Sequence, residues 1–504
     1  MQQNYMNKLA KGGSFFLVFT VLNFLLMFGF KVFAARYLEP DFFGVFVLTQ
    51  TVLNIAGLVA YVGVGKLVTK YVPEYATKSE PMKLSGVIIY SYAMPLLLSL
   101  LVSGILYFFA PQLTEFFGFP ELMVLGFRVV AVALPFHMIM KTNNNLLLAK
   151  KEYFKNRLIS SIDKIVLFLG ILAIIFFTMP IFFVFYLFFA GLILASLISL
   201  LFLSTTQRYF STANLPEFRM KEWSWFSLYL VFLGTSYLVL RWTDNIMISK
   251  FLDAESLGVY SVGISFAAFI LMAQNIFGPL ILPLFSELKN LREDMIPKFY
   301  EKSAIWSFGL GTIIFMVMVG FSRQVINIFF GQEYVGGALI VAIVGFGYLI
   351  SLLLGFAQQV LIIYDRPDLN FKIDFAVAIY NIMMNFILIT IYGLVGAAIT
   401  TSSSFIIRKL LMYHYAKRFI QPRINILASI KFVVSSGLGV LFVFIVLNFI
   451  DGKWFSLISA GVVYLLVTSF MLIGLRVASA EDIVIISQIE KKLNISLSWL
   501  KRFL

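Results

Sequence analysis

Among the ionisable residues inside long apolar segments of this sequence, six are the main candidates for a function. Four are cations and two are carboxylates: Arg128, Lys164, Arg241, Arg408, Asp163 and Asp244. A charge within a membrane-spanning helix is costly and usually faces a cavity or a partner, so each is a candidate functional residue. The arginine guanidinium group can hold a phosphate through two parallel hydrogen bonds. We therefore predict that the four cations bind a phosphate or pyrophosphate group in a cationic cavity.

These cations also have a simpler explanation. A long cationic side chain near the end of a helix can reach the lipid headgroups without serving any ligand. This explanation is favoured for Lys31, Lys141 and Lys409, which lie near predicted helix ends. The cavity is favoured for the three arginines among the candidates.

The two carboxylates have two explanations of equal weight. They either bind a coupling ion, H⁺ or Na⁺, or serve as counter-charges. Asp244 lies three residues after Arg241, hence on the same helical face and within reach of it. Cysteine is absent and only two histidines occur, so we predict no metal site. No catalytic motif or phosphate-binding glycine loop is found, so we expect neither an enzyme nor a cofactor.

The composition indicates that the elements carrying these residues are membrane helices. Charged residues make up 13% of the chain and hydrophobic residues 61%, whereas soluble proteins carry roughly 25% charged residues. A membrane-spanning helix needs about 20 predominantly apolar residues. We predict an all-α membrane protein with about 14 transmembrane helices. The expected spans are near 13–34, 42–65, 84–110, 121–142, 158–178, 181–203, 225–249, 257–283, 304–322, 337–363, 373–392, 395–416, 430–450 and 454–476.

The distribution of basic residues predicts the orientation. Most of the 39 Lys and Arg residues fall in the even-numbered connections and the two tails. Because cytoplasmic loops carry the excess of Lys and Arg, we place both termini in the cytoplasm and the protein in the cell membrane. The net charge of +14 would suit a nucleic acid, but its position beside the membrane argues against that partner.

Two short motifs repeat along the chain. Residues 35–46 and 249–260 share a cation, an aromatic residue, Leu, acidic residues and a Gly-Val-aromatic ending, displaced by 214 residues (from Arg36 to Lys250). The Phe-Phe-Gly sequence of 116–118 returns at 329–331. These echoes predict two pseudo-symmetric six-helix halves, which in parallel-repeat transporters enclose the substrate and rock against each other.

The repeat predicts four parts of the chain. They are an N-terminal six-helix half (1–210), a C-terminal six-helix half (211–420), two additional transmembrane helices (421–476) and an amphipathic cytoplasmic tail (477–504). In the tail, apolar residues recur at helical spacing beside lysines, as in helices that lie on a membrane surface.

The run from Lys8 to Gly44 and the segment 241–252 resemble the polysaccharide transporter family. These are the Wzx-type oligosaccharide-lipid flippases of the MOP exporter superfamily. The resemblance implies a flippase that moves a polyprenyl-(pyro)phosphate-linked oligosaccharide from the cytoplasmic to the outer leaflet for polysaccharide or glycan assembly. Its partners would be membrane lipids and a polymerase or glycosyltransferase, and undecaprenol and dolichol carriers both fit.

Three other functions stay open. Cation-coupled multidrug or small-molecule antiporters often carry an acidic residue in the first helix, and peptidoglycan-precursor lipid flippases usually carry charge there. Residues 13–30 contain no charged residue, which lowers both alternatives. A membrane-embedded glycosyltransferase would bring a large outer loop with acidic residues, whereas the longest outer connection, 323–336, offers only Glu333.

Overall fold

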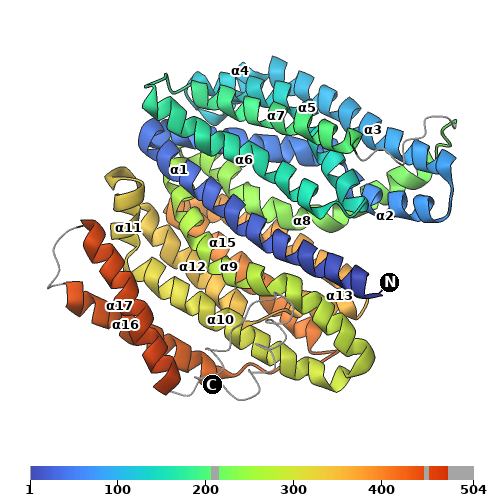
Figure 1. Cartoon of the computed structure of the whole chain (residues 1–504). Coiled ribbons are helices and arrows are strands. Elements are labelled where there is room, and N and C mark those ends of the chain that lie inside the picture. Colours follow the sequence, from blue (N-terminus) through green and yellow to red (C-terminus); the bar gives the residue numbers. More distant parts are fainter. Residues whose placement is uncertain (1, 206–214, 448–452, 475–504) are drawn as a thin grey trace. The chain divides into compact units, whose positions relative to one another are not determined.

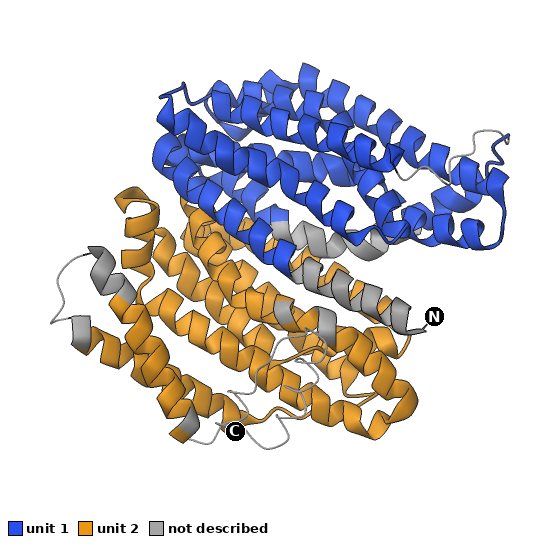
Figure 2. Cartoon of the chain, in the orientation of Figure 1, with its two compact units in different colours: residues 1–258 blue, residues 259–504 orange. Residues whose placement is uncertain are grey.

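The computed structural model describes residues 2–205, 215–447 and 453–474, and every regular element in these ranges is a helix (Figure 1). Two compact units divide the chain, Met1–Gly258 and Val259–Leu504 (Figure 2). The predicted all-α fold is therefore confirmed. Helices suit such an apolar chain because lipid offers no hydrogen-bond partners to the main chain, and a helix satisfies them internally.

The first unit contains eight helices and the start of a ninth within its described residues. They are α1 (Gln2–Tyr61), α2 (Val64–Thr77), α3 (Pro81–Phe108), α4 (Ala110–Phe117), α5 (Leu122–Ala149), α6 (Tyr153–Phe176), α7 (Phe183–Ser204), α8 (Met220–Phe251) and the first turn of α9 (Ala254–Leu291).

The second unit holds the rest of α9 and the elements that follow it. They are η1 (Glu293–Met295), α10 (Ile296–Gly320), α11 (Ser322–Phe329), η2 (Gln332–Tyr334), α12 (Gly337–Leu353), α13 (Ala357–Ile363), α14 (Pro367–Tyr392), α15 (Leu394–Ala416), α16 (Ile426–Leu447) and α17 (Lys453–Gly474).

Within the described residues, 10 helices are long and apolar enough to cross a membrane, or 11 when the bent pair α12 and α13 counts as one span. The chain is a multi-pass membrane protein. Helix α1 runs for 60 residues, about 90 Å at 1.5 Å per residue, against a hydrocarbon core of about 30 Å. It is broken at Glu39, which has φ 62° and ψ 164° and precedes Pro40. The count of about 14 spans stays a prediction, as do the four parts of the chain; the tail 477–504 lies outside the described residues.

The sequence repeat has a structural counterpart in each motif. The first motif breaks the helix path at Glu39, and its second copy separates the end of α8 at Phe251 from the start of α9 at Ala254. The second motif ends the short helices α4 and α11, each of 8 residues. Gly118 and Gly331 follow these helices with φ of 68° and 115°, a region that glycine enters without a steric cost.

Helices α1 and α9 cross at two glycines that occupy equivalent places in the repeat. A Cβ atom on Gly44 would overlap the carbonyl oxygen of Ala254, and one on Gly258 would lie 2.5 Å from the carbonyl oxygen of Pro40. In the repeat, Pro40 corresponds to Ala254 and Gly44 to Gly258. In both contacts, the glycine of one motif therefore lies against the carbonyl oxygen four residues before the glycine of the other motif. Small residues four apart let two membrane helices approach this closely.

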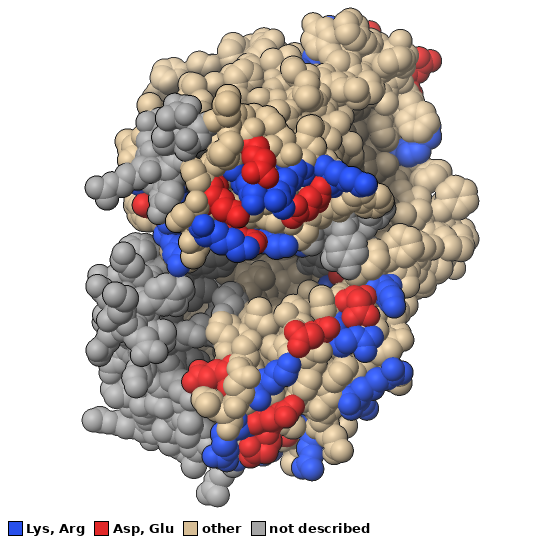
Figure 3. Space-filling model, turned by 90° about the vertical axis from the view of Figure 1, so that its right-hand side faces the viewer, with Lys and Arg blue, Asp and Glu red and all other residues tan. Residues whose placement is uncertain are grey.

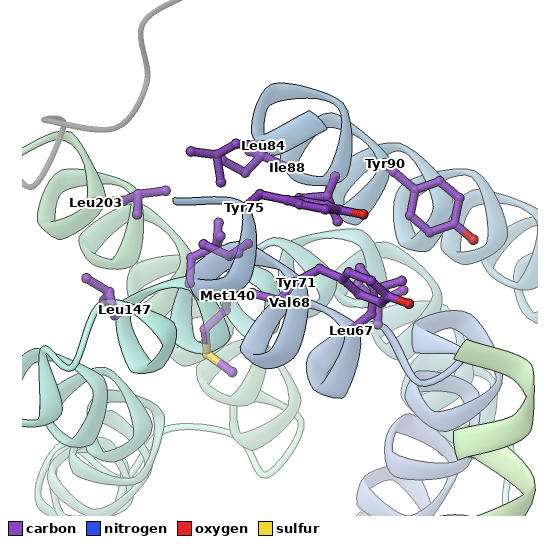
Figure 4. Close-up of a cluster of buried hydrophobic side chains, with 14 of the residues drawn as sticks. Leu67, Val68, Tyr71, Tyr75, Leu84, Ile88, Tyr90, Met140, Leu147 and Leu203 are labelled. Carbon is purple, nitrogen blue, oxygen red and sulfur yellow. The ribbon is translucent and has the colours of Figure 1, made fainter. Parts of the chain in front are cut away.

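Helix α2 is amphipathic and covers a hydrophobic cluster (Figure 4). Its buried residues recur at helical spacing, and Figure 4 shows Tyr71 and Tyr75 among them, with Tyr90 of α3 nearby. The indole of Trp223, at the start of α8, donates to the hydroxyl of Tyr75 over 3.3 Å and is fully buried. Burial, and then the hydrogen bond to Glu222, raise the pKa of Tyr71 to about 12, so this phenol stays a donor.

Exposed charged side chains of both signs lie next to one another on the face drawn in Figure 3. Several form exposed pairs over short sequence distances, such as Lys78 with Glu74 at 2.6 Å and Arg366 with Asp368 at 2.9 Å. These pairs lower the pKa of the Glu74 and Asp368 carboxyl groups, chiefly through the hydrogen bond from the cation. Exposed pairs of this kind contribute little to stability.

Candidate functional site

A buried ion pair joins α14 and α15 in the second unit. The Arg408 guanidinium group donates from Nε to Oδ1 of Asp374 at 2.7 Å and from Nη2 to Oδ2 at 3.3 Å. The side chains are 6% and 9% exposed. Nη2 also lies 3.5 Å from Oε1 of Gln358 in α13. The two-pronged geometry matches the way arginine holds carboxylates and phosphates.

A second cation lies beside this pair. Lys409 is 1% exposed, and its ammonium group donates to the carbonyl oxygen of Gly355 at 3.1 Å. Gly355, with φ of 67°, lies between α12 and α13, where the helix path bends by 43° and leaves its carbonyl free of a regular helical bond. Two buried cationic side chains, Arg408 and Lys409, thus follow each other on α15, and Arg408 bonds to the carboxylate of Asp374.

Polar side chains continue from this cluster along the seam between α14 and α15. The amide of Asn381 donates to the hydroxyl of Ser404 at 3.1 Å, and Asn385 donates to Asn381 at 3.1 Å. Tyr380 donates to Ser403 at 3.0 Å. Such bonds hold membrane helices together, so this seam positions Arg408 without itself pointing to a ligand.

Lys164 and Asp163 lie on α6 in the first unit and bond to each other. The ammonium group is 3.0 Å from Oδ1 of Asp163 and 2.7 Å from the carbonyl oxygen of Ser160. The two side chains are 26% and 21% exposed. The charge of Lys164 is thus compensated within α6, as the counter-charge explanation of Asp163 requires. A role for either residue in substrate or ion binding stays a prediction.

Arg128 is exposed near the start of α5. Its guanidinium carbon lies 5.3 Å from the centroid of the Tyr107 ring, at the end of α3. Tyrosines and cationic side chains commonly gather at the membrane–water interface, so this contact suits a side chain that reaches the headgroups. Its assignment to a cavity stays a prediction. Asp244 is 4% exposed on α8, whereas the side chain of Arg241 lies outside the described residues.

The structure also reveals a polar ladder that the sequence interpretation passed over. His137, Lys141 and Asn145 follow one another at intervals of four on α5, which runs to Ala149 rather than to the expected end near 142. Lys141 thus lies about 12 Å from the end of α5, and its ammonium group lies close to Gly57 of α1. The interval of four was the signal available in the sequence, because it places all three on one face. Within the described residues, no group of three or more His, Asp or Glu side chains is placed to hold a metal ion.

The family comparison agrees with this architecture. The family described as "Polysaccharide biosynthesis protein" matches residues 33–339, more than half of the chain. The chain belongs to this family. Its membership confirms the resemblance expected from residues 8–44 and 241–252.

Curated relatives of this polysaccharide biosynthesis family member match it over part of its length. An uncharacterized membrane protein of Methanocaldococcus jannaschii is 23% identical over 271 residues, 53% of each chain. The "Probable low-salt glycan biosynthesis flippase Agl15" of Haloferax volcanii is 26% identical over 214 residues, 42% of this chain and 43% of that protein. The "Capsular polysaccharide biosynthesis protein CapF" of Staphylococcus aureus is 29% identical over 167 residues, 32% and 42% of the two chains. The matches thus span about half the length of these relatives, or less.

Two solved structures share the fold of this family member. One is the lipid II flippase MurJ in an inward closed conformation, with a TM-score of 0.70, 16% identity, and coverage of 90% of this chain and 97% of that one. The other is an inward-facing multidrug resistance MATE family transporter of the MOP superfamily, with a TM-score of 0.65, 12% identity, and coverage of 79% and 94%. Both are transporters, and at this identity the likeness shows a common fold.

Proposed function

We propose that this chain is a flippase for a lipid-linked glycan. It moves a polyprenyl-(pyro)phosphate-linked oligosaccharide from the cytoplasmic to the outer leaflet, by alternating access through a cationic cavity. Membership in the polysaccharide biosynthesis family supports this function, and so do relatives whose names specify glycan biosynthesis and flipping. The fold shared with MOP transporters supports a transport role.

One observation carries the substrate class: two buried cationic side chains, Arg408 and Lys409, follow each other on α15, and Arg408 already holds the Asp374 carboxylate through two hydrogen bonds. Cationic side chains inside a membrane protein are costly and commonly mark the path of a substrate or ion. The guanidinium group of Arg408 donates two hydrogen bonds to the Asp374 carboxylate. Two oxygens of a phosphate group can accept the same pair of hydrogen bonds. In this mechanism the phosphate displaces Asp374 from part of the guanidinium group, and Lys409 neutralises the second negative charge.

The other candidate residues complete the proposal. Further cations along the path of the anionic headgroup are Arg128, Lys164 and Arg241. The carboxylates act either as ion-coupling groups, for H⁺ or Na⁺, or as counter-charges; they are Asp163 and Asp244. The protein lies in the cell membrane with both termini cytoplasmic, and the basic connections support this orientation. A polymerase or glycosyltransferase would supply or consume the glycan.

The decisive experiment measures flipping of a fluorescent polyprenyl-pyrophosphate oligosaccharide in liposomes that contain the purified protein. We expect flipping by the wild type, and loss of flipping in Arg408→Gln. Arg418→Gln is the matched control, because Arg418 is an exposed arginine just beyond α15. Absence of flipping by a folded, monodisperse wild type would overturn the proposal.

Two further functions follow from the shared fold. Lipid II flipping and multidrug resistance transport are the activities named for the MurJ and MATE structures, and they correspond to the peptidoglycan-precursor flippase and the cation-coupled drug antiporter that the sequence left open. The same liposomes can be offered lipid II, or a fluorescent cationic drug with a proton or sodium gradient. Transport of either compound without transport of the oligosaccharide lipid would replace the glycan flippase with that function.

A further inference from the structure

The polar ladder of α5 faces a part of α1 that leaves room for it. His137, Lys141 and Asn145 lie on one side of α5, opposite Gly57 and Tyr61. A Cβ atom on Gly57 would lie 3.3 Å from the Lys141 ammonium nitrogen and 3.4 Å from Cδ2 of His137. Because Gly57 has no side chain, the Lys141 ammonium group and the His137 ring can both lie close to the main chain of α1. All five residues belong to the first unit.

The polar ladder donates a hydrogen bond to α1, and the charged group at its centre is the ammonium group of Lys141. Asn145 donates to the hydroxyl of Tyr61 at 3.1 Å, and the Lys141 ammonium nitrogen lies 5.8 Å from the centroid of the Tyr61 ring. Among the described residues, no carboxylate pairs with Lys141. The ring face offers partial compensation only, since a cation–π contact is weaker than an ion pair.

His137 supplies the second, independent observation. It is 8% exposed, and neither Nδ1 nor Nε2 has a hydrogen-bond partner among the described residues. Buried polar groups in proteins are nearly always hydrogen-bonded, so both ring nitrogens of His137 are available to bond a further group. The charged neighbours of His137 are Lys141 on its own helix and Lys164 on α6, and both are cations.

The charges around the ladder define the ligand. Lys141 and Lys164 are positive, and the nearby carboxylate of Asp163 is already bonded to Lys164. A cationic ligand would be repelled, whereas an anion with several acceptor oxygens could bond to the Lys141 ammonium group and to an N–H of His137. Phosphate and pyrophosphate esters have this chemistry.

The repeat places a second lysine at the corresponding point of the other unit. At the repeat offset of 214 residues, Lys141 corresponds to Gly355 and Asn144 corresponds to Gln358. The carbonyl oxygen of Gly355 is the group that the Lys409 ammonium contacts at 3.1 Å. The first unit therefore has a lysine at this position of the repeat, and in the second unit a lysine of α15 contacts the residue that takes its place.

We propose that Lys141, His137 and Tyr61 form a binding site in the first unit for the phosphate or pyrophosphate group of the transported lipid. Lys141 provides the charge, His137 and the Tyr61 hydroxyl provide hydrogen bonds, and Asn145 positions Tyr61. The site deepens the proposed flippase function and rests on it, because that function supplies the lipid.

The test measures binding to the purified full-length protein by thermophoresis, with undecaprenyl pyrophosphate in one arm and inorganic pyrophosphate in the other. We expect Lys141→Ala to weaken binding of the lipid by about tenfold or more, as the loss of a charge-assisted bond requires. Lys141→Arg should restore most of it. Gly57→Ala retains every charged group but moves the ammonium, so it should weaken binding as well. Lys66→Ala, an exposed lysine on α2, is the control and should bind as the wild type does.

The outcomes separate this inference from the function on which it rests. Wild-type affinity in folded Lys141→Ala and Gly57→Ala, with normal flipping by the wild type, would overturn the site and keep the flippase. Failure of the wild type to bind or flip the lipid would remove the flippase itself. Equal affinity for inorganic pyrophosphate and the lipid would overturn the lipid headgroup as the ligand, in favour of a free anion. If Lys141→Ala does not fold, Gly57→Ala decides.

Discussion

The side-chain amide of Asn156 donates to the main-chain carbonyl of Asn144 at 2.8 Å, and the repeat contains the same bond again. Asn370 donates to the main-chain carbonyl of Gln358 at 3.3 Å, 214 residues further along both partners (156 to 370 and 144 to 358). One bond joins α6 to α5, and the other joins α14 to α13. The duplication that short loop motifs indicated thus extends to a partly buried hydrogen bond within each unit.

Replacing either asparagine should destabilise its own unit. Asn156→Ala and Asn370→Ala each remove a partly buried hydrogen bond between two helices, so we expect a loss of about 0.5–1.5 kcal/mol in each case. Thermal unfolding in detergent, followed by circular dichroism, measures the change. Asn290→Ala is the control, because Asn290 makes a similar bond to Ser286 on an exposed surface. A loss in only one of the two variants would contradict the structural equivalence of the repeats.

The glycine crossing of α1 and α9 should tolerate no side chain. Gly44→Ala places a methyl group onto the carbonyl oxygen of Ala254, a main-chain atom that cannot rotate away. Overpacking of this kind costs about 1–3 kcal/mol or more, and we expect a marked fall in melting temperature. Gly104→Ala in α3 is the matched control, since no atom lies within 4 Å of its new Cβ. Equal melting temperatures for the two variants would refute the close contact.

The absence of cysteine allows the orientation to be tested directly. Lys78 and Arg292 lie in predicted cytoplasmic connections, and Glu115 and Arg323 in predicted outer ones; all four are exposed. We expect an impermeant maleimide to label Glu115→Cys and Arg323→Cys in intact cells, and to label Lys78→Cys and Arg292→Cys only after lysis. Labelling of Lys78→Cys and Glu115→Cys from the same side would mean that α3 does not cross the membrane, and the predicted count would fall.

The fold was predictable because its signals are local. A run of apolar residues is visible in the sequence wherever it occurs, and so are the repeated motifs at Glu39 and Gly118 that break helices. Helix ends were less predictable: α5 continues past its apolar segment through a run of asparagines to Ala149, because packing against neighbouring helices satisfies those side chains.

The candidate site was predictable only in part, because its pairings are not local. Arg408 was recognised as a buried cation, but its bond to Asp374 depends on how α14 and α15 pack, which no spacing in the sequence records. Lys141 was assigned to the headgroups from its distance to a misplaced helix end. Its position opposite Gly57 follows from the packing of α5 on α1.

The ion pair of Arg408 and Asp374 can be separated into a structural and a functional part. Asp374→Ala leaves a buried guanidinium group without its carboxylate and should cost about 3–5 kcal/mol in stability. Replacing both partners by apolar residues, Arg408→Met with Asp374→Leu, removes both charges and should cost much less, because no buried charge is left unpaired. Unfolding of the single and double variants in detergent measures this difference.

Flipping assays on the same variants then show what the pair is for. If Arg408 binds the phosphate of the lipid, the stable double variant should fail to flip the oligosaccharide lipid although it is folded. The control, Arg418→Gln, keeps the buried pair and should flip at the wild-type rate. A double variant that flips at the wild-type rate would show that the pair serves only to join α14 to α15. The substrate cation of this unit would then have to be Lys409, which Lys409→Met tests in the same liposomes.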